Sequence, residues 1–253
     1  MFKVGEHGEV PAPEVYFMTD FDKWTRLSFY VFLIDSSDGY ILLNTGLVRD
    51  LTKSNKFLKQ WAGSDRCRLS VSDDQKMDQI LKRCSLSEDD IAHVILSPVQ
   101  DHTVGSLDLF RTAKIYFSRM GWYQEVVNPH ARQLVFDRDV ALPAYIRSYL
   151  FEDAWSRIRL VENEEILEGL SVRWTGAHHR SSMSVVLKMK EKLIGITDAA
   201  FTWRNIEDNI PIGIAEDIHE ALDAYEYLRK TCDNIIPAYD PENVIRFKEF
   251  LGA

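Results

Sequence analysis

The sequence has few cysteines, no long apolar run and no segment that resembles a secretion signal. Its three cysteines, Cys67, Cys84 and Cys232, lie far apart and lack the close spacing of a disulfide framework or a zinc ribbon. Scattered, odd-numbered cysteines are typical of proteins in a reducing compartment. No stretch reaches the roughly 18 apolar residues that a membrane span requires. We therefore expect a cytoplasmic protein that does not enter a membrane.

The chain also has fewer basic than acidic residues, which argues against partners that carry many negative charges. The chain has 30 Lys and Arg against 39 Asp and Glu, a formal net charge of −9. Because no basic stripe offsets this balance, neither nucleic acid nor an anionic membrane surface is an expected partner. A small-molecule substrate or ligand fits better, and the sequence leaves the oligomeric state open.

The length and composition predict one globular domain over residues 1–253. Apolar residues make up 45% of the chain and charged residues 27%, which is ordinary for a globular protein. No internal repeat or Gly/Ser linker divides it. Residues 119–157 are rich in aromatic side chains and irregular to helical in pattern, so we predict a helical lid or insertion there.

Short apolar runs in both halves predict β-strands. Asp38-Gly39 between two such runs is typical of a hairpin turn. Strands are predicted at 28–34, 40–43, 93–96, 113–117, 158–161, 170–174, 184–189, 193–197 and 234–237. Helices are predicted over much of 51–83, from a start at 85–88, near 105–111 and over 218–230. Two β-rich halves that each carry helices favour an α+β protein with a four-layer αββα sandwich.

Four loops that follow apolar strands carry unusual polar groups. They are Asp101-His102, Ala177-His178-His179, Thr197-Asp198-Ala199 and Pro237-Ala238-Tyr239-Asp240. If the loops meet at one edge, their imidazoles and carboxylates suit a divalent metal such as zinc, iron or manganese.

Each group also has a purely structural interpretation. Asp198 can cap a turn, Tyr239 can be a packing aromatic, and one of the two adjacent histidines can be an exposed loop residue. The remaining histidines fall in none of these loops, and we interpret them as structural or surface residues: His7, His93, His130 and His219.

In this order, the loops resemble those of the metallo-β-lactamase superfamily, and in particular its N-acyl homoserine lactonases. The segment FYVFLIDSSDGYILLNTGL resembles the opening hairpin, and LSEDDIAHVILSPVQDHTVGSLDLFRTAKIYFSR resembles the segment with the HxHxDH motif. TGAHHRSSMSVVL, GITDAAF and DNIIPAYDPE are similar to the later Gly-His, Gly-Asp and terminal Pro-Gly-His segments. The resemblance covers nearly the whole chain and implies the αββα fold.

The resemblance also implies a metal site from which ligands have been lost. The family holds two metals with seven ligands, and four of these match here: Asp101, His102, His178 and Asp198. Ser97, Val99 and Tyr239 stand where the family has histidines. Asn44 replaces a bracing aspartate, and Phe201 stands where lactonases often carry a tyrosine that contacts the substrate. We therefore expect at most one metal, held by Asp101, His102 and Asp198, with His178 as a further candidate ligand.

Three hypotheses follow from this incomplete site. The protein is a divergent hydrolase of a small ester, lactone or amide with one metal, a metal-free enzyme that uses acid–base chemistry, or a non-catalytic binding protein that keeps the fold. The working hypothesis is the hydrolase. Its candidate catalytic residues are Asp101, His178 and Tyr239, and its candidate substrate contacts are Phe201, Trp122 and Tyr149. Without a cation, we expect one of the two aspartates to bind a proton or to pair with a histidine.

Overall fold

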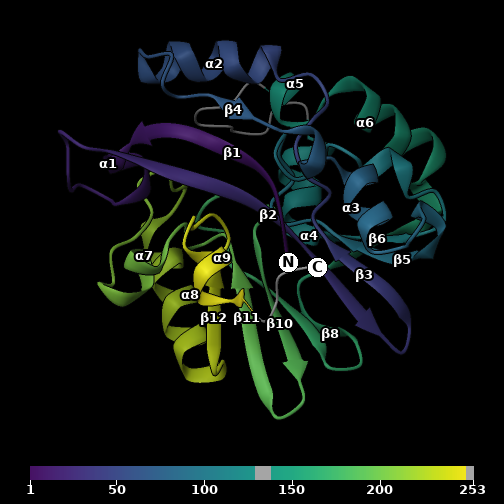
Figure 1. The fold of residues 1–253 in the computed structure, drawn as a ribbon. Helices are drawn as coiled ribbons and strands as arrows, with labels where there is room; N and C mark the ends of the chain where they lie inside the picture. The colour runs from purple at the N-terminus through teal and green to yellow at the C-terminus, as the bar shows by residue number, and fades with distance from the viewer. Residues whose placement is uncertain (129–137, 249–253) are drawn as a thin grey trace.

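Two β-sheets lie face to face in the computed structural model, which describes residues 1–128 and 138–248 (Figure 1). The larger sheet has the order β4 (Leu69–Ser70), β1 (Phe2–Pro11), β2 (Trp24–Ser36), β3 (Gly39–Leu43), β5 (Ile91–Ile95), β6 (Lys114–Ser118), β7 (Ile158–Val161). The smaller sheet has the order β12 (Asn234–Pro237), β11 (Lys192–Thr197), β10 (Met183–Met189), β9 (Leu170–Trp174), β8 (Asn163–Leu167).

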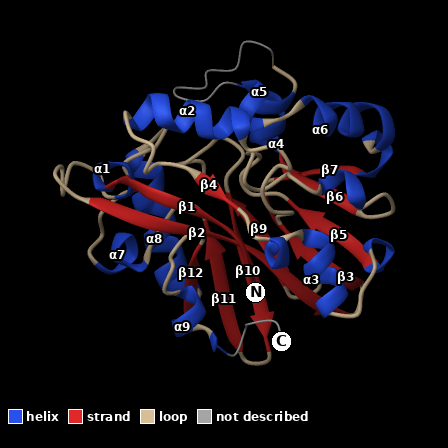
Figure 2. Ribbon diagram, turned by 45° about the horizontal axis from the view of Figure 1, so that its top comes forward, coloured by secondary structure: helices blue, strands red, loops and turns tan. Residues whose placement is uncertain are grey.

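Helices cover the outer faces of both sheets (Figure 2). Those that pack outside the larger sheet are α2 (Thr52–Ala62), α3 (Met77–Arg83), α4 (Arg119–Gly121), α5 (Arg138–Ala141) and α6 (Ala144–Ser148). Those outside the smaller sheet are α7 (Trp203–Glu207) and α8 (Ile218–Thr231). Two single-turn helices, α1 (Ala12–Val15) and α9 (Asn243–Arg246), lie at the margins. The predicted αββα sandwich is confirmed.

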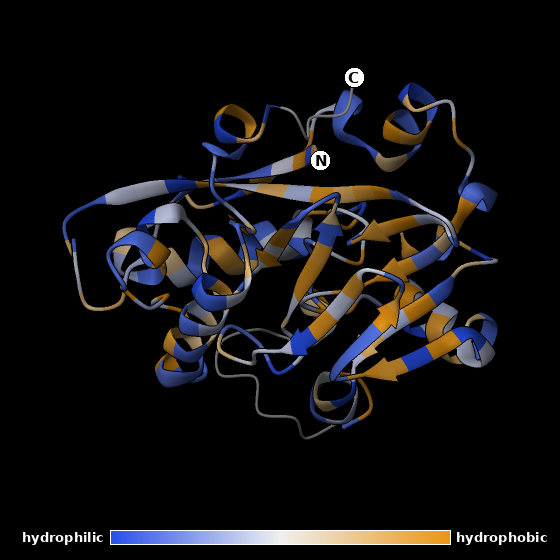
Figure 3. Ribbon diagram, turned by 90° about the horizontal axis from the view of Figure 1, so that it is seen from below, coloured by the Kyte–Doolittle hydropathy of each residue, from blue (hydrophilic) through white to orange (hydrophobic). Residues whose placement is uncertain are grey.

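The alternation of side chains along the central strand β2 explains why the layers form. Phe29 and Val31 pack beneath the helices, whereas Tyr30 and Phe32 point into the core between the two sheets. Successive side chains of a strand point to opposite faces, so a strand covered on both sides is apolar at every position. Figure 3 shows this as strands coloured hydrophobic along most of their length in the middle of the molecule.

Helix α8 confirms the helix predicted over 218–230. Asp217 caps its first turn by accepting hydrogen bonds from the backbone N–H groups of His219 and Glu220. Its buried face, which includes Tyr225 and Leu228, packs on the smaller sheet. The Tyr225 hydroxyl donates to the carbonyl of Ala199 at 2.9 Å, which anchors the loop after β11.

Three strands, β1, β4 and β8, were not predicted, and two predicted helices reduce to single turns. Strand β1 contains two glycines and several charged residues, and its pairing with β2 is interrupted by irregularities. Strand β8 is mostly polar and exposed. The helix predicted from 85–88 is one 3₁₀ turn, Glu88–Asp90, because β5 begins at the next residue. The helix predicted near 105–111 is likewise one turn, Leu107–Leu109.

Residues 119–128 and 138–157 pack against the outside of the larger sheet. They form short helices and two π-helical turns, Trp122–Val126 and Tyr149–Asp153. Residues 129–137 of the predicted lid lie outside the described part of the chain. None of the helices described is both long and apolar enough to cross a membrane.

Candidate functional site

The four polar loops meet at one edge of the sandwich. The His102 Nε2 lies 2.9 Å from the Tyr239 hydroxyl, and the His178 Nδ1 lies 3.3 Å from the Asp198 carboxylate. The rings of His178 and Tyr239 are 6.1 Å apart between centroids. The structure therefore brings together all four matching residues and Tyr239, although they are spread over more than half of the chain.

A hydrogen-bonded chain runs from Ser54 to Tyr239. The Ser54 hydroxyl of α2 donates to Asp101 at 2.5 Å, and the other Asp101 oxygen lies 3.4 Å from the His102 Nδ1. Because a carboxylate faces Nδ1, the neutral imidazole carries its proton there, and Nε2 accepts the proton of the Tyr239 hydroxyl. The pKa of the Tyr239 hydroxyl is raised well above its usual value by burial and then by Asp198 and Asp101, so the phenol stays neutral.

Asp198 lies deeper, among neutral hydroxyl groups. Ser182 donates to one carboxylate oxygen, and the Ser97 hydroxyl lies 3.4 Å from the other. Burial raises the pKa of Asp198 to about 7, although these hydrogen bonds oppose the shift. Burial also lowers the pKa of His178 well below its usual value. Of the two aspartates, Asp198 is therefore the one that holds a proton up to about neutral pH, beside a neutral His178.

Asn44 and Ser97 make hydrogen bonds through their amide and hydroxyl groups at positions where the resemblance implies an aspartate and a metal-binding histidine. The Asn44 side chain accepts from the Ser97 N–H and donates to the Ser97 carbonyl, both at 2.9 Å. The Ser97 hydroxyl donates to the carbonyl of Met183 at 2.8 Å. These bonds fix the loop after β5 to both sheets, so this loop is held without a ligand at position 97.

A mostly apolar pocket of about 80 Å³ opens above the chain from Asp101 to Tyr239. Phe29 and Phe201 form its inner wall, with ring centroids 5.5 Å and 5.1 Å from that of Tyr239. Trp61 and Val140 line it farther out. Phe201, predicted as a substrate contact, lies in this wall. The Trp61 indole donates to Glu14 at 2.8 Å, and burial raises the pKa of Glu14 to about 7.

His7 lines the same pocket, which corrects its interpretation as a structural or surface residue. Its Nδ1 is buried and accepts or donates no hydrogen bond within the described ranges. Burial lowers the pKa of His7 to about 4, with His102 as the second cause, so the ring is neutral. His7 lies on β1, the strand that the sequence did not predict, and no local pattern marks it as a pocket residue.

Trp122 and Tyr149, predicted as substrate contacts, are packing residues. The Trp122 ring packs edge-on against Phe117, with 5.1 Å between centroids. The Tyr149 hydroxyl donates to the carbonyl of Phe110 at 2.9 Å, and the Arg157 guanidinium donates to that hydroxyl at 2.8 Å. Neither residue lines the pocket above Tyr239. Their aromatic character reflects the core beneath α4 and α6.

The residues that the resemblance assigns to a metal do not fit one in this arrangement. No three of Asp101, His102, His178 and Asp198 offer ligand atoms that all lie within 4.8 Å of one another. The His102 Nε2 already faces the Tyr239 hydroxyl, and Asp198 is enclosed by serine hydroxyls. A catalytic zinc usually has three protein ligands. We therefore derive no step of a reaction through a metal at this position.

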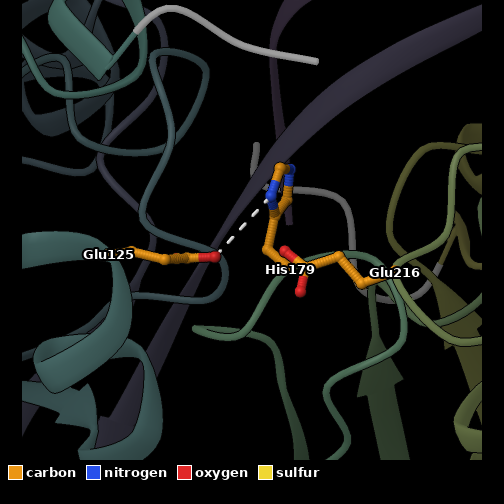
Figure 4. Close-up of side chains that lie close together, drawn as sticks. All are labelled: Glu125, His179 and Glu216. Carbon is orange, nitrogen blue, oxygen red and sulfur yellow. Dashed lines mark ion pairs between the residues drawn. The ribbon is translucent and has the colours of Figure 1, made fainter. Parts of the chain in front are cut away.

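His179 belongs to a different group from its neighbour. The His178 and His179 side chains are 6% and 8% exposed, so neither is the exposed loop residue that the sequence predicted. His179 lies with Glu125 and Glu216, and one ligand atom from each of the three lies within 4.8 Å of the others (Figure 4). Burial raises the pKa of Glu125 to about 7. The close approach of the Glu125 turn needs Gly121, where a Cβ would lie 2.3 Å from the Ser181 Cα.

Comparison with known proteins shows which proteins share this fold. No family model matches the chain. An N-acyl homoserine lactonase of Bacillus thuringiensis is 19% identical over 192 residues, which cover 75% of this chain and 70% of that protein. Among solved structures, an N-acyl homoserine lactone hydrolase with the product N-hexanoyl-L-homoserine bound at its catalytic metal center has a TM-score of 0.78 at 17% identity, covering 97% of this chain and 94% of the other. A hydrolase of the β-lactamase superfamily has a TM-score of 0.64 at 15% identity, covering 95% and 90%. The chain has the metallo-β-lactamase fold that these hydrolases share.

Proposed function

We propose that this protein is a lactonase-like hydrolase of small apolar esters or lactones that works without a metal in its pocket. The observation that carries the proposal is the hydrogen bond between the Tyr239 hydroxyl and the His102 Nε2 at the base of the apolar pocket. Structural neighbours with the same fold bind N-acyl homoserine products, which have a short polar head and an apolar acyl chain.

The chain from Asp101 to Tyr239 supplies a route for a proton. A water molecule at the Tyr239 oxygen gives its proton to that oxygen as the phenolic proton moves to the His102 Nε2. The water attacks the substrate carbonyl, and the same proton returns through Tyr239 to the leaving alkoxide. Asp101 stabilises the imidazolium that forms in between. A proton transfer of this kind contributes about 10²–10⁴-fold to a rate.

The walls of the pocket set the substrate class. Phe29, Phe201 and Trp61 favour an apolar chain, and His102 and His178 line the same pocket and supply its polar groups. The lowered pKa values of His7 and His178 and the raised pKa of Glu14 leave few full charges in the pocket. A neutral ester or lactone suits such a pocket better than a charged substrate, because a charge would have to be buried without a partner.

The test is a panel of N-acyl homoserine lactones and p-nitrophenyl esters of increasing chain length, assayed with excess chelator. We expect turnover that persists in chelator and falls sharply in His102→Gln and Tyr239→Phe. Activity that requires added zinc or manganese, or that survives both substitutions, contradicts the proposal.

A non-catalytic binding function is the second candidate. It is favoured by the packing of Phe201 against both His178 and Tyr239, at 4.7 Å and 5.1 Å between centroids, which leaves little room for a reacting water. Ligand-dependent thermal stabilisation by an uncleaved lactone, with no turnover in the panel, supports this candidate over the hydrolase.

A further inference from the structure

We propose that Glu125, His179 and Glu216 form a divalent-cation site that is separate from the pocket and holds the His178–His179 loop in place. The three residues come from different parts of the fold. Glu125 belongs to the π-helical turn Trp122–Val126, His179 to the loop between β9 and β10, and Glu216 to the segment before α8. A cation between them would cross-link all three.

The geometry of the three side chains suits a metal ion. One ligand atom from each lies within 4.8 Å of the other two, and Figure 4 shows both carboxylates beside the imidazole. Within the described ranges, no other three His, Cys, Asp or Glu side chains bring their ligand atoms this close together. Small side-chain rotations bring such atoms to the ~2.0–2.2 Å of a metal–ligand bond.

Glu125 adds an independent observation, because one of its buried oxygens lacks a partner. Its side chain is 4% exposed. One carboxylate oxygen accepts the Arg180 N–H at 2.8 Å and Ser181 also approaches the carboxyl group, whereas Oε2 has no well-aligned hydrogen bond from the residues that the structure describes. Buried carboxylate oxygens are rarely left in this state, since burying a polar atom without a partner costs free energy. A bound cation supplies the missing partner.

The local charge balance favours a cation as well. Glu125, Glu216 and Glu220 bring three carboxylates into this region, and Arg180 brings one guanidinium. Arg180 pairs with Glu216 at 2.8 Å and also with Glu220, so the three acidic side chains outnumber the one guanidinium. One divalent cation cancels this excess.

The ligand chemistry indicates which ions fit. One imidazole and two carboxylates suit zinc, manganese or ferrous iron rather than calcium, which prefers oxygen ligands alone. The Gln100 side-chain amide nitrogen lies 3.3 Å from the His179 Nδ1 and restrains the position of the ring. Glu216 is the partly exposed member and marks the side from which an ion enters.

The test is a titration of the chelator-treated full-length protein with Zn²⁺ or Mn²⁺, followed by calorimetry and by metal analysis after gel filtration. We expect one ion per chain. At a metal concentration about a hundredfold above Kd, the melting temperature should rise by about 5–10 °C. Co²⁺ should give visible absorption bands that report an imidazole ligand.

Variants distinguish this site from the pocket. Glu125→Gln and Glu216→Gln should each lower the affinity for metal by at least tenfold, the range expected for loss of a direct or closely supporting ligand contact. Glu220→Gln is the matched control, because Glu220 shares Arg180 but lies outside the group of three. Asp198→Asn and His102→Gln should also keep the ion, and a folded Glu216→Gln protein at unchanged ellipticity excludes unfolding as the cause.

Three results would overturn the proposal. They are no binding of either metal to the chelator-treated protein, binding that survives Glu125→Gln and Glu216→Gln together, and binding that is lost in Asp198→Asn or His102→Gln. None of these readouts depends on turnover, so the outcome is independent of the proposed hydrolase activity.

Discussion

His178 and His179 are adjacent, equally buried and chemically identical, yet they belong to two different environments. Their rings lie 4.1 Å apart between centroids and are inclined by 51°. His178 faces Asp198, which is surrounded by serine hydroxyls and the Tyr239 ring, whereas His179 faces Glu125 and Glu216. Burial lowers the pKa of both histidines.

The difference lies in how each environment balances its charge. On the His178 side, the hydroxyl groups of Ser182 and Ser97 lie against the two oxygens of Asp198. On the His179 side, the carboxylates outnumber the one neighbouring arginine. The same side chain at the same depth therefore serves different chemistry, because the groups opposite it decide what it can bind.

The largest expected effect is on the His178 side. Tyr239→Phe removes the hydroxyl that links His102 to the pocket, and we expect kcat for the best ester or lactone to fall by about 10²–10⁴-fold. Tyr149→Phe is the matched control, since its hydroxyl is also buried and hydrogen-bonded but lies outside the pocket. Equal losses in the two variants would mean that Tyr239 acts through folding alone.

The next effect is a pH dependence of the free energy of unfolding, which Asp198 contributes on the His178 side. The folded pKa of Asp198 is about 7, against an ordinary value of 3.8. Below pH 3.8 both states hold the proton, and the stabilisation is complete. As pH rises toward 7, the unfolded chain ionises first, so the free energy of unfolding falls by about 1.4 kcal/mol per pH unit. We expect Asp198→Asn to flatten this decline in urea denaturation with chelator present.

Glu125 gives the corresponding pH effect on the His179 side. Its pKa is also raised by burial, to about 7, so chelator-treated protein should lose stability with rising pH through this group as well. Added Zn²⁺ should remove the Glu125 contribution and leave that of Asp198. If the metal instead removes the Asp198 contribution, the cation binds beside His178 and Asp198, which contradicts the proposed site at Glu125, His179 and Glu216.

A smaller effect is expected at the mouth of the pocket. Trp61 lines it and is 46% exposed, so its truncation costs little stability. Trp61→Ala should raise KM for long-chain substrates by about tenfold, because lost apolar contact in a pocket costs about 1–3 kcal/mol. Trp155→Ala is the control, a 58% exposed tryptophan that does not line the pocket. Equal KM values for Trp61→Ala and wild type would remove Trp61 from the substrate path.

The smallest expected effect is a loss of stability in Tyr149→Phe, which tests whether Tyr149 is a packing residue and not a substrate contact. Tyr149→Phe removes its hydrogen bonds with Phe110 and Arg157, and the free energy of unfolding should fall by about 1–2 kcal/mol. Substrate affinity should stay the same. A change in KM without a change in stability would return Tyr149 to the list of substrate contacts.

Much of the fold followed from the sequence because its signals are local. Apolar runs ending at polar loops marked β5, β11 and β12, and the Asp38-Gly39 turn marked the first hairpin. Side-chain alternation and turn chemistry act over a few residues, so a pattern predicts them. The meeting of the four polar loops at one edge was predicted because their order along the chain resembles that in the metallo-β-lactamase superfamily.

What the sequence could not decide depends on distant contacts. Strand β1 exists because β2 pairs with it, not because its own glycine-containing sequence favours a strand, and His7 reached the pocket unpredicted for that reason. Glu125, His179 and Glu216 are separated by up to 91 residues and come together only where a π-helical turn and two loops pack. The sequence alone determined which titratable side chains follow the strands, whereas the tertiary structure decided which side chains face one another, because burial and charge balance act through space and not along the chain.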